Sequence, residues 1–133
     1  MESTGRPEER PLTVLVVDDE AGIREAVVYH LKDCGFLVLE ACDGREALEI
    51  LEAIPDIDIL FSDVRMPGLG GVELAKWVSR NRPSTSIFLA TGDMGKQFTA
   101  DELCGAMVVR KPYRLHAISA SLRDAAMTKR GMR

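Results

Sequence analysis

The sequence predicts one α/β domain, a three-layer α/β/α sandwich around a five-stranded parallel sheet. Short apolar runs alternate with longer segments of helical periodicity, which is typical of repeated βα units. The first, third, fourth and fifth of these runs are almost continuously apolar, as in strands covered on both faces. Right-handed crossovers then place helices on both sides of the sheet. A chain of 133 residues is long enough for one domain and not two.

The expected strands cover residues 12–17, 36–41, 57–62, 86–90 and 107–109. The first helix runs from about residue 20 to 34, because Ile23, Val27, Leu31 and Cys34 recur at helical spacing. Gly35 suits its C-cap.

The other helices follow from the same two signals, spacing and capping. Asp43 and Glu46 resemble a capping box before a helix that ends at Pro55 and buries Ala47, Leu48, Leu51 and Ile54. A third helix covers about residues 72–80. Thr99 and Glu102 form a second capping-box pattern, so the fourth helix is expected to be short and to start late. The last helix follows Pro112 and buries Leu115, Ile118, Leu122 and Ala126.

Composition excludes several classes of protein. The net charge of -4 provides no basic face for nucleic acid. No apolar run approaches the ~20 residues that cross a bilayer, and the N-terminus lacks a signal-peptide pattern, so a cytoplasmic protein without membrane contact is expected. The three cysteines lack metal-binding spacing and indicate reduced thiols. The domain is expected at residues 11–128, between a disordered tail at 1–10 and a basic, solvated tail at 129–133.

Ligand-type residues stand where four of the expected strands end. Asp18 and Asp19 follow the first strand, Asp63 the third, Thr91 the fourth and Lys111 the fifth. In an open parallel sheet, ligands bind outside the carboxyl ends of the strands, so these side chains are expected in one crevice. Two carboxylates at ~4 Å repel by about 4 kcal/mol at an effective dielectric of 20. Three together therefore call for a cation, and hard oxygen ligands in a wet site suit Mg²⁺, or Mn²⁺ in its place.

The remaining groups suit a phosphoryl group beside that cation. Asp63 is the expected acceptor, because carboxylates form aspartyl-phosphates when cations neutralise the incoming group. Lys111 and Thr91 could reach two phosphoryl oxygens, as an ammonium and a hydroxyl. Each residue also has an ordinary explanation: Asp18 or Asp19 could cap a helix, and Asp63 could start the turn at Pro67 and Gly68. Only the combination points to phosphoryl chemistry.

Four motifs in this order resemble the receiver domain of bacterial two-component response regulators. They are Val16-Val17-Asp18-Asp19-Glu20, Ser62-Asp63-Val64-Arg65-Met66-Pro67-Gly68, Ala90-Thr91-Gly92 and Arg110-Lys111-Pro112-Tyr113. The resemblance implies a flavodoxin-like sheet of order 2-1-3-4-5, the order found in the family's chemotaxis member. It also implies phosphorylation of Asp63, Mg²⁺ held by Asp18, Asp19, Asp63 and the backbone carbonyl of Arg65, and a cis bond before Pro112.

The resemblance further implies a signalling module rather than an enzyme. Its partners would be a sensor histidine kinase or a histidine phosphotransfer protein, and a downstream protein on the face formed by the fourth helix, fifth strand and fifth helix. The chain would be a monomer or a weak homodimer. One departure is Val108, which stands where the family usually has an aromatic switch residue. A shortened fourth helix could replace that rotamer switch with an order–disorder change.

Three readings of the whole chain follow. The first is a stand-alone receiver without an output domain. The second is a receiver cut from a longer response regulator or hybrid kinase. The third, from another class, is a small Mg²⁺-dependent phosphatase with an aspartyl-phosphate intermediate. Such enzymes usually have an acid two residues after the nucleophile, where this chain has Arg65, so turnover of phosphate esters would distinguish them.

Overall fold

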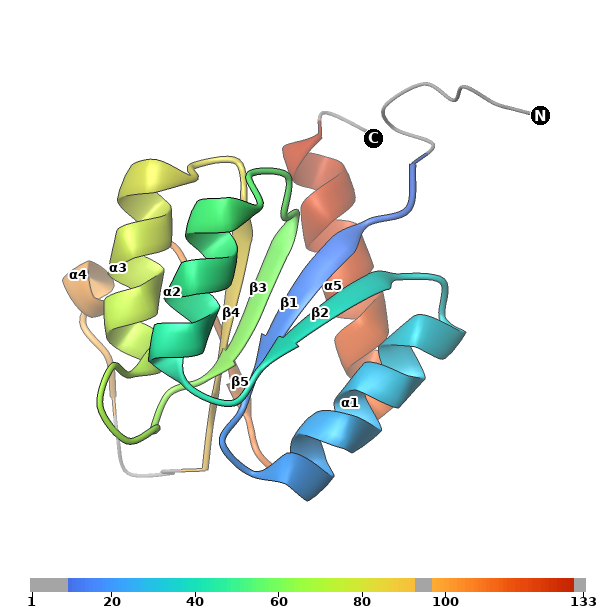
Figure 1. Cartoon of the computed structure of the whole chain (residues 1–133), viewed down its shortest axis with the longest axis horizontal. Coiled ribbons are helices and arrows are strands. Elements are labelled where there is room, and N and C mark those ends of the chain that lie inside the picture. The colour runs from blue at the N-terminus through green and yellow to red at the C-terminus, as the bar shows by residue number, and fades with distance from the viewer. Residues whose placement is uncertain (1–9, 93–96, 131–133) are drawn as a thin grey trace.

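A parallel five-stranded sheet lies between two layers of helices (Figure 1). The computed structural model describes residues 10–92 and 97–130. Its strands are β1 Thr13–Val17, β2 Leu37–Ala41, β3 Ile59–Asp63, β4 Ser86–Thr91 and β5 Met107–Arg110. Its helices are α1 Ala21–Asp33, α2 Gly44–Ala53, α3 Gly71–Asn81, α4 Ala100–Leu103 and α5 Leu115–Lys129. The strand order β2-β1-β3-β4-β5 confirms the expected fold.

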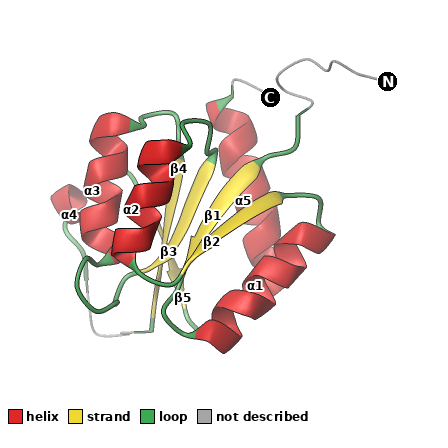
Figure 2. Ribbon diagram, in the orientation of Figure 1, coloured by secondary structure: helices red, strands yellow, loops and turns green. Residues whose placement is uncertain are grey.

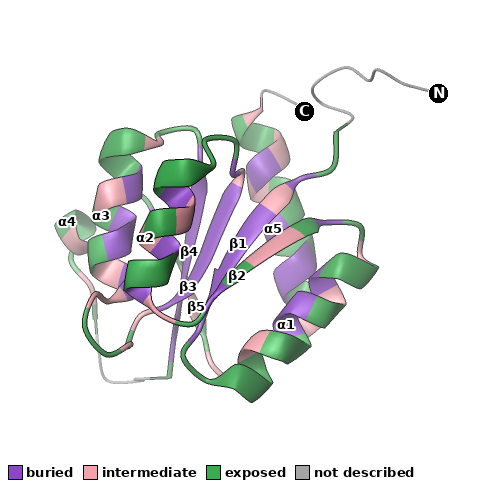
Figure 3. Ribbon diagram, viewed as in Figure 1, coloured by how far each residue is buried: buried purple, intermediate pink, exposed green. Residues whose placement is uncertain are grey.

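The two helical layers pack on opposite faces of the sheet, with α1 and α5 on one side and α2, α3 and α4 on the other (Figure 2). Side chains of a strand alternate between the faces, so each central strand contributes to both cores. Val14, Val16, Phe61 and Phe88 pack toward α1 and α5. Leu15, Val17, Leu60 and Leu89 pack with residues of α2 and α3. Burial is therefore deepest along β1, β3 and β4 (Figure 3).

The prediction that the fifth strand is covered on both faces is wrong. β5 is an edge strand with a single neighbour, and Met107 at its start is 48% exposed. The adjacent helix α4 has only four residues, which leaves little to cover this edge. Its short length and late start confirm the expectation from the Thr99–Glu102 capping box, in which Thr99 N–H donates to Glu102 Oε1 and Glu102 N–H to Thr99 Oγ1.

Two residues of the apolar stripes read from the sequence are exposed, and one of them, Ile54, was expected to be buried. Ile23 is 37% exposed, because α1 packs through its middle and end, where Val27, Val28 and Leu31 are buried. Ile54 is 38% exposed, because it lies beyond the last turn of α2, at the C-cap. The Asp43 carboxylate caps α2 by accepting from Glu46 N–H at 2.8 Å. Glu46 reaches back one residue further than expected, to Cys42 N–H at 2.7 Å.

The C-terminal end of α5 is held against the start of the sheet. Lys129 and Arg130 were expected in a solvated tail, but Lys129 is helical and its ammonium donates to Pro83 O at 2.8 Å. The Arg130 guanidinium pairs with the Asp58 carboxylate at 3.2 Å, and the same carboxylate accepts from Thr13 N–H. The expected N-terminal tail at 1–9 and residues 131–133 lie outside the described residues. Within the described ranges no helix is long and apolar enough to span a membrane.

Candidate functional site

The site lies where the carboxyl ends of the central strands meet. β1 and β3 are parallel neighbours in a register that pairs Val17 with Ser62, so the residues that follow this pair emerge side by side. Asp18 stands directly after β1, and Asp63 is the last residue of β3. The Asp18 backbone N–H still bonds to Ala41 O at 3.2 Å, which fixes the strand end. The register of the sheet thus joins acids 45 positions apart in sequence.

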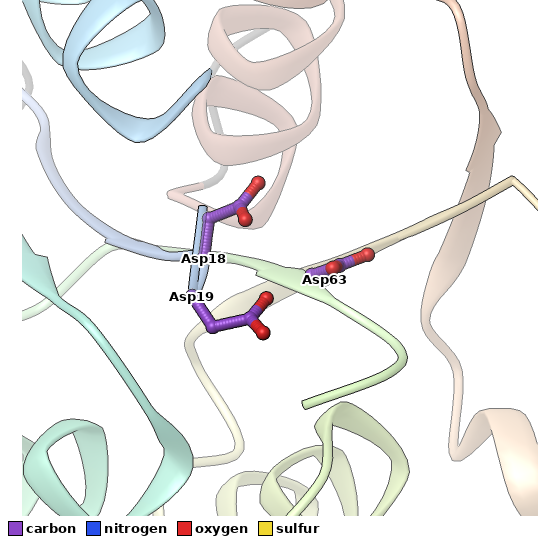
Figure 4. A group of neighbouring side chains, drawn as sticks. All are labelled: Asp18, Asp19 and Asp63. Carbon is purple, nitrogen blue, oxygen red and sulfur yellow. The ribbon is translucent and has the colours of Figure 1, made fainter. Parts of the chain in front are cut away.

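Asp18, Asp19 and Asp63 form one carboxylate cluster (Figure 4). Each offers one oxygen, and the three oxygens lie within 4.8 Å of one another. Asp18 and Asp63 are 5% and 9% exposed, whereas Asp19 is open to solvent. Asp18 Oδ1 also accepts from Glu20 N–H at 2.9 Å, a turn contact just before α1. The N-cap of α1 is Glu20 and no side chain caps it, so neither Asp18 nor Asp19 is the helix cap that its position allowed.

Lys111 and Thr91 line the same pocket as Asp63. Lys111 Nζ lies 3.1 Å from Asp63 Oδ1. Lys111 N–H donates to Thr91 O at 2.9 Å, which ties the end of β4 to the residue after β5. The Lys111–Pro112 peptide bond is cis. Asp63, Arg65, Thr91, Gly92 and Lys111 line a pocket of about 330 Å³. All five strand-end residues singled out in the sequence thus reach one edge of the sheet.

Burial dominates the electrostatics of Asp63. Its desolvation raises the carboxyl pKa above 3.8, the Lys111 ammonium opposes this, and the charges of Asp18 and Asp19 raise the pKa further. A nearly buried acid beside two other acids is therefore only partly compensated by one lysine. A divalent cation bound by the three carboxylates would remove this imbalance. The donor set consists of hard oxygens beside solvent, which fits Mg²⁺.

The turn after β3 brings its backbone close to the site. Gly71 begins α3, and its N–H donates to Val64 O at 3.0 Å. A Cβ atom on Gly71 would collide with the backbone carbonyl oxygen of Asp63. Gly68 adopts a φ of 75°, a left-handed conformation that favours glycine. The glycines of this turn thus let the chain fold back against Asp63 while Arg65 stays exposed.

Sequence reasoning missed Arg24, which braces the loop after β1. Its Nη1 donates to Asp18 O at 2.7 Å, and its Nε pairs with Glu40 Oε1 at 3.1 Å. The arginine therefore links the first turn of α1, the acidic loop and β2. An arginine in the first helical turn is unfavourable for the helix dipole, and this was the signal that it has another partner.

An aromatic pair lies behind the carboxylates, toward α1 and α5. The Tyr113 ring contacts Phe61 edge to face, with ring centroids 5.7 Å apart. Burial raises the pKa of the Tyr113 phenol to about 12, and the charges of Asp18 and Asp63 add to the shift. Val108 lies on β5 opposite Leu89, where its side chain is partly exposed. The Tyr113 phenol therefore stays neutral beside the acidic cluster.

This fold, with three carboxylates and a lysine at the carboxyl edge of the sheet, defines a class of α/β domains with an acidic site at the strand ends. A family model for the response regulator receiver domain matches residues 14–123, and the chain belongs to that family. Receiver domains are the phosphoacceptor modules of two-component signalling.

Solved structures agree with this assignment. The chain is 31% identical to the chemotaxis protein CheY4 of Vibrio cholerae, with a TM-score of 0.77 over 87% of this chain and 99% of that one. It is 26% identical to a response regulator receiver domain protein from Clostridium thermocellum, with a TM-score of 0.79 over 90% and 97% of the two chains.

Curated relatives are longer proteins of several kinds. A cyclic di-GMP phosphodiesterase of Thermotoga maritima is 38% identical over 60% of this chain and 21% of its own length. A probable transcriptional regulator, ycf27, of Guillardia theta is 36% identical over 83% of this chain and 43% of that protein. A sensor kinase, CckA, of Brucella abortus is 32% identical over 84% of this chain and 12% of its own length. The chain therefore spans less than half of each of these relatives.

Proposed function

We propose that Asp63 is the phosphoacceptor and that it takes its phosphoryl group from a phosphohistidine. The observation that carries this proposal is the cluster of three carboxylate oxygens within 4.8 Å of one another, with Lys111 Nζ 3.1 Å from Asp63. The phosphohistidine would belong to a sensor histidine kinase or a histidine phosphotransfer protein. Partners of these two kinds suit the family, and one relative is itself named a sensor kinase.

The proposed transfer moves the phosphoryl group from an imidazole nitrogen of the donor to a carboxylate oxygen of Asp63. A carboxylate oxygen of Asp63 forms a bond to phosphorus as the phosphorus–nitrogen bond of the donor breaks. The imidazole leaves with the electron pair of that bond and takes a proton from solvent. Lys111 exchanges its contact with the Asp63 carboxylate for one with a phosphoryl oxygen, and the Thr91 hydroxyl serves a second oxygen. These groups act by position and charge, since they neither form nor break covalent bonds.

Asp18, Asp19, Asp63 and the backbone carbonyl of Arg65 would hold Mg²⁺ in this proposal. When bound, the ion supplies charge neutralisation for the acceptor and the incoming phosphoryl group. The cluster is suited to it because two of its acids are almost buried while Asp19 faces solvent. An ion with open access to water on one side can keep several of its own waters.

Phosphorylation would alter partner binding on the face formed by α4, β5 and α5. This face is connected to the site through Lys111, which follows β5, and through Thr91, whose carbonyl accepts from Lys111 N–H. β5 is an open edge of the sheet, so a partner can reach it. Phosphorylation shifts the equilibrium between two conformers only if the phosphoryl group interacts more favourably with one of them. A change of their population ratio from 1:99 to 99:1 needs a difference of about 5.5 kcal/mol.

The proposal is tested by incubating the protein with Mg²⁺ and acetyl phosphate and measuring its intact mass. We expect one phosphate increment in the wild type, none in Asp63→Ala, and none in the wild type with excess EDTA. Asp56→Ala is the matched control, because Asp56 is an exposed carboxylate in the loop before β3. An unlabelled wild type, or equal labelling of Asp63→Ala, would contradict the assignment of the acceptor.

A further inference from the structure

The helices α1 and α5 lie side by side on one face of the sheet (Figure 1), and each brings polar side chains to the interface between them. On α1, His30 in the last turn and Cys34 at the C-cap are four residues apart, a spacing that places them on the same side of the helix. On α5, His116 and Ser119 face them. A thiol, two imidazoles and a hydroxyl therefore meet at one place. Cysteine spacing alone did not reveal this group, because its other members are not cysteines.

The contacts at this interface are centred on His30 Nε2. Cys34 Sγ lies 3.5 Å from this nitrogen, and Ser119 Oγ lies 3.1 Å from it. The His116 ring contacts the His30 ring edge to face, with ring centroids 5.0 Å apart. A sulfur and a nitrogen that bind one tetrahedral Zn²⁺, at about 2.3 Å and about 2.0 Å from the metal, are separated from each other by about 3.5 Å. The thiol and the imidazole are thus already at the spacing of two zinc ligands.

Neighbouring groups hold this pair in place. Arg123 Nη2 donates to Cys34 O at 2.7 Å, which ties the end of α1 to α5. Ser119 is buried, and its Oγ donates to His116 O at 3.1 Å, which keeps the hydroxyl beside His30 Nε2. Groups that hold a ligand side chain in this way are important for metal affinity, because they orient the ligand. Less ordering is then needed when an ion binds.

Ions in solution can reach the pair. His30 and Cys34 are half-buried, and His116 is exposed. Cys34 also lines an open pocket of about 620 Å³ together with Ser119 and Arg123 of α5. His30, Cys34 and His116 do not converge as closely as the three carboxylates do, since the His116 ring contacts the ring of His30. The exposure of His116 leaves its side chain room to turn.

We propose that His30, Cys34 and His116 bind one zinc ion that links α1 to α5. His30 Nε2 and the Cys34 thiolate are two ligands, His116 turns its ring to supply the third, and water completes the tetrahedron. Thiolate and imidazole ligands suit Zn²⁺, whereas Mg²⁺ prefers carboxylates. On binding, one Zn–S bond and two Zn–N bonds form, and the Cys34 thiol gives its proton to solvent. No phosphoacceptor group takes part, so either proposal can fail without the other.

The test is a titration of the reduced protein with Co²⁺, a spectroscopic substitute for Zn²⁺, in excess Mg²⁺ that occupies the carboxylates. We expect a saturable thiolate-to-cobalt charge-transfer band in the near ultraviolet, which Zn²⁺ removes. Cys34→Ser should abolish the band, and Cys42→Ser, the matched control at an exposed thiol, should keep it. Ser119→Ala removes a group that orients His30 and should weaken Co²⁺ binding about 10- to 100-fold. His116→Gln removes a ligand and should weaken binding at least as much.

Alkylation of the wild-type protein provides a second arm that needs no substitution. Zn²⁺ should protect the half-buried Cys34 from iodoacetamide, measured by peptide mass spectrometry, and leave the exposed Cys42 as reactive as before. Three outcomes would overturn the proposal: no charge-transfer band in the wild type, an undiminished band in Cys34→Ser, or undiminished Co²⁺ affinity in His116→Gln. Equal protection of Cys34 and Cys42 would also overturn it, because it would show an adventitious ion only.

Discussion

At Asp63 two effects act in opposite directions on one carboxyl group. Burial raises its pKa, and the Lys111 ammonium at 3.1 Å lowers it without cancelling the rise. The acid that the proposed reaction needs as a nucleophile is thus held in an environment that disfavours its charge. In the proposed reaction a bound cation would relieve this cost, so the same residue would serve both as a metal ligand and as the acceptor.

The raised pKa of Asp63 predicts how stability depends on pH. The ordinary pKa of the Asp63 carboxyl is 3.8, and above this pH the metal-free folded chain holds more protons at Asp63 than the unfolded chain does. The contribution of Asp63 to the free energy of unfolding is therefore lost as the pH rises through its raised pKa. Asp63→Asn has no carboxyl group at this position and does not lose stability in this way. We expect the free energy of unfolding of Asp63→Asn, relative to the wild type in EDTA, to increase between about pH 4 and pH 7.

Urea denaturation of both proteins across this pH range measures that difference. Asp56→Asn is the control, because Asp56 is exposed, and its difference from the wild type should not follow the same trend. A flat or decreasing difference for Asp63→Asn would show that the lysine, and not burial, dominates the Asp63 carboxyl.

At the scale of elements, the turn between β3 and α3 sets the distance between the helix and the site. Gly71 lies against the Asp63 carbonyl so closely that a Cβ atom has no room, and the nearby atoms are backbone. Leu74, Ala75 and Val78 hold the rest of α3 in the core. The helix can therefore adapt to a larger residue only by shifting the strand end that carries Asp63.

Two glycine substitutions separate this contact from ordinary helix propensity. Gly71→Ala should destabilise the protein by about 1–3 kcal/mol, as overpacking does, and should slow labelling by acetyl phosphate. Gly22→Ala, in the first turn of α1, meets nothing within 4 Å and should stabilise the protein by about 0.5–1 kcal/mol. Chemical denaturation measures both changes, and equal effects of the two substitutions would argue against the close approach at Gly71.

Several elements were predictable because they depend on local signals. The apolar runs that became β1, β3 and β4 are buried throughout or nearly so, and the Thr99–Glu102 box marks the start of α4. The exposure of Ile23 and of β5 was not predictable in this way. Helical spacing shows that a residue lies on an apolar stripe, but the length of the stripe that finds a partner depends on how far the helix overlaps the sheet.

At the scale of the whole molecule, the sheet brings the ends of two strands, β1 and β3, to one carboxylate cluster. Mg²⁺ bound at Asp18, Asp19 and Asp63 would link β1 to β3, and a ligand that binds only the folded state stabilises it by mass action. We expect Mg²⁺ at about 100-fold over its Kd to add about 2.7 kcal/mol to the free energy of unfolding and to raise the Tm.

Differential scanning calorimetry with and without Mg²⁺ measures this stabilisation. Asp18→Asn should lose most of it, whereas Asp56→Asn, with its carboxylate in an exposed loop, should keep it. If Asp18→Asn were stabilised as much as the wild type, the ion would bind elsewhere and the proposed ligand set would be wrong.

The sequence by itself determined the alternation of strands and helices and the chemical type of each strand-end residue. These follow from local periodicity, from capping, and from the rule that parallel strands present their carboxyl ends at one edge. Tertiary structure decided what depends on register and on the length of each strand. It set the 3.1 Å contact of Lys111 with Asp63 and the partners of Arg24 and Arg130. It also set the pairing of β4 with β5, which starts at Phe88 and Met107 although β4 itself begins at Ser86. Such features arise between segments distant in sequence, so no local pattern contains them.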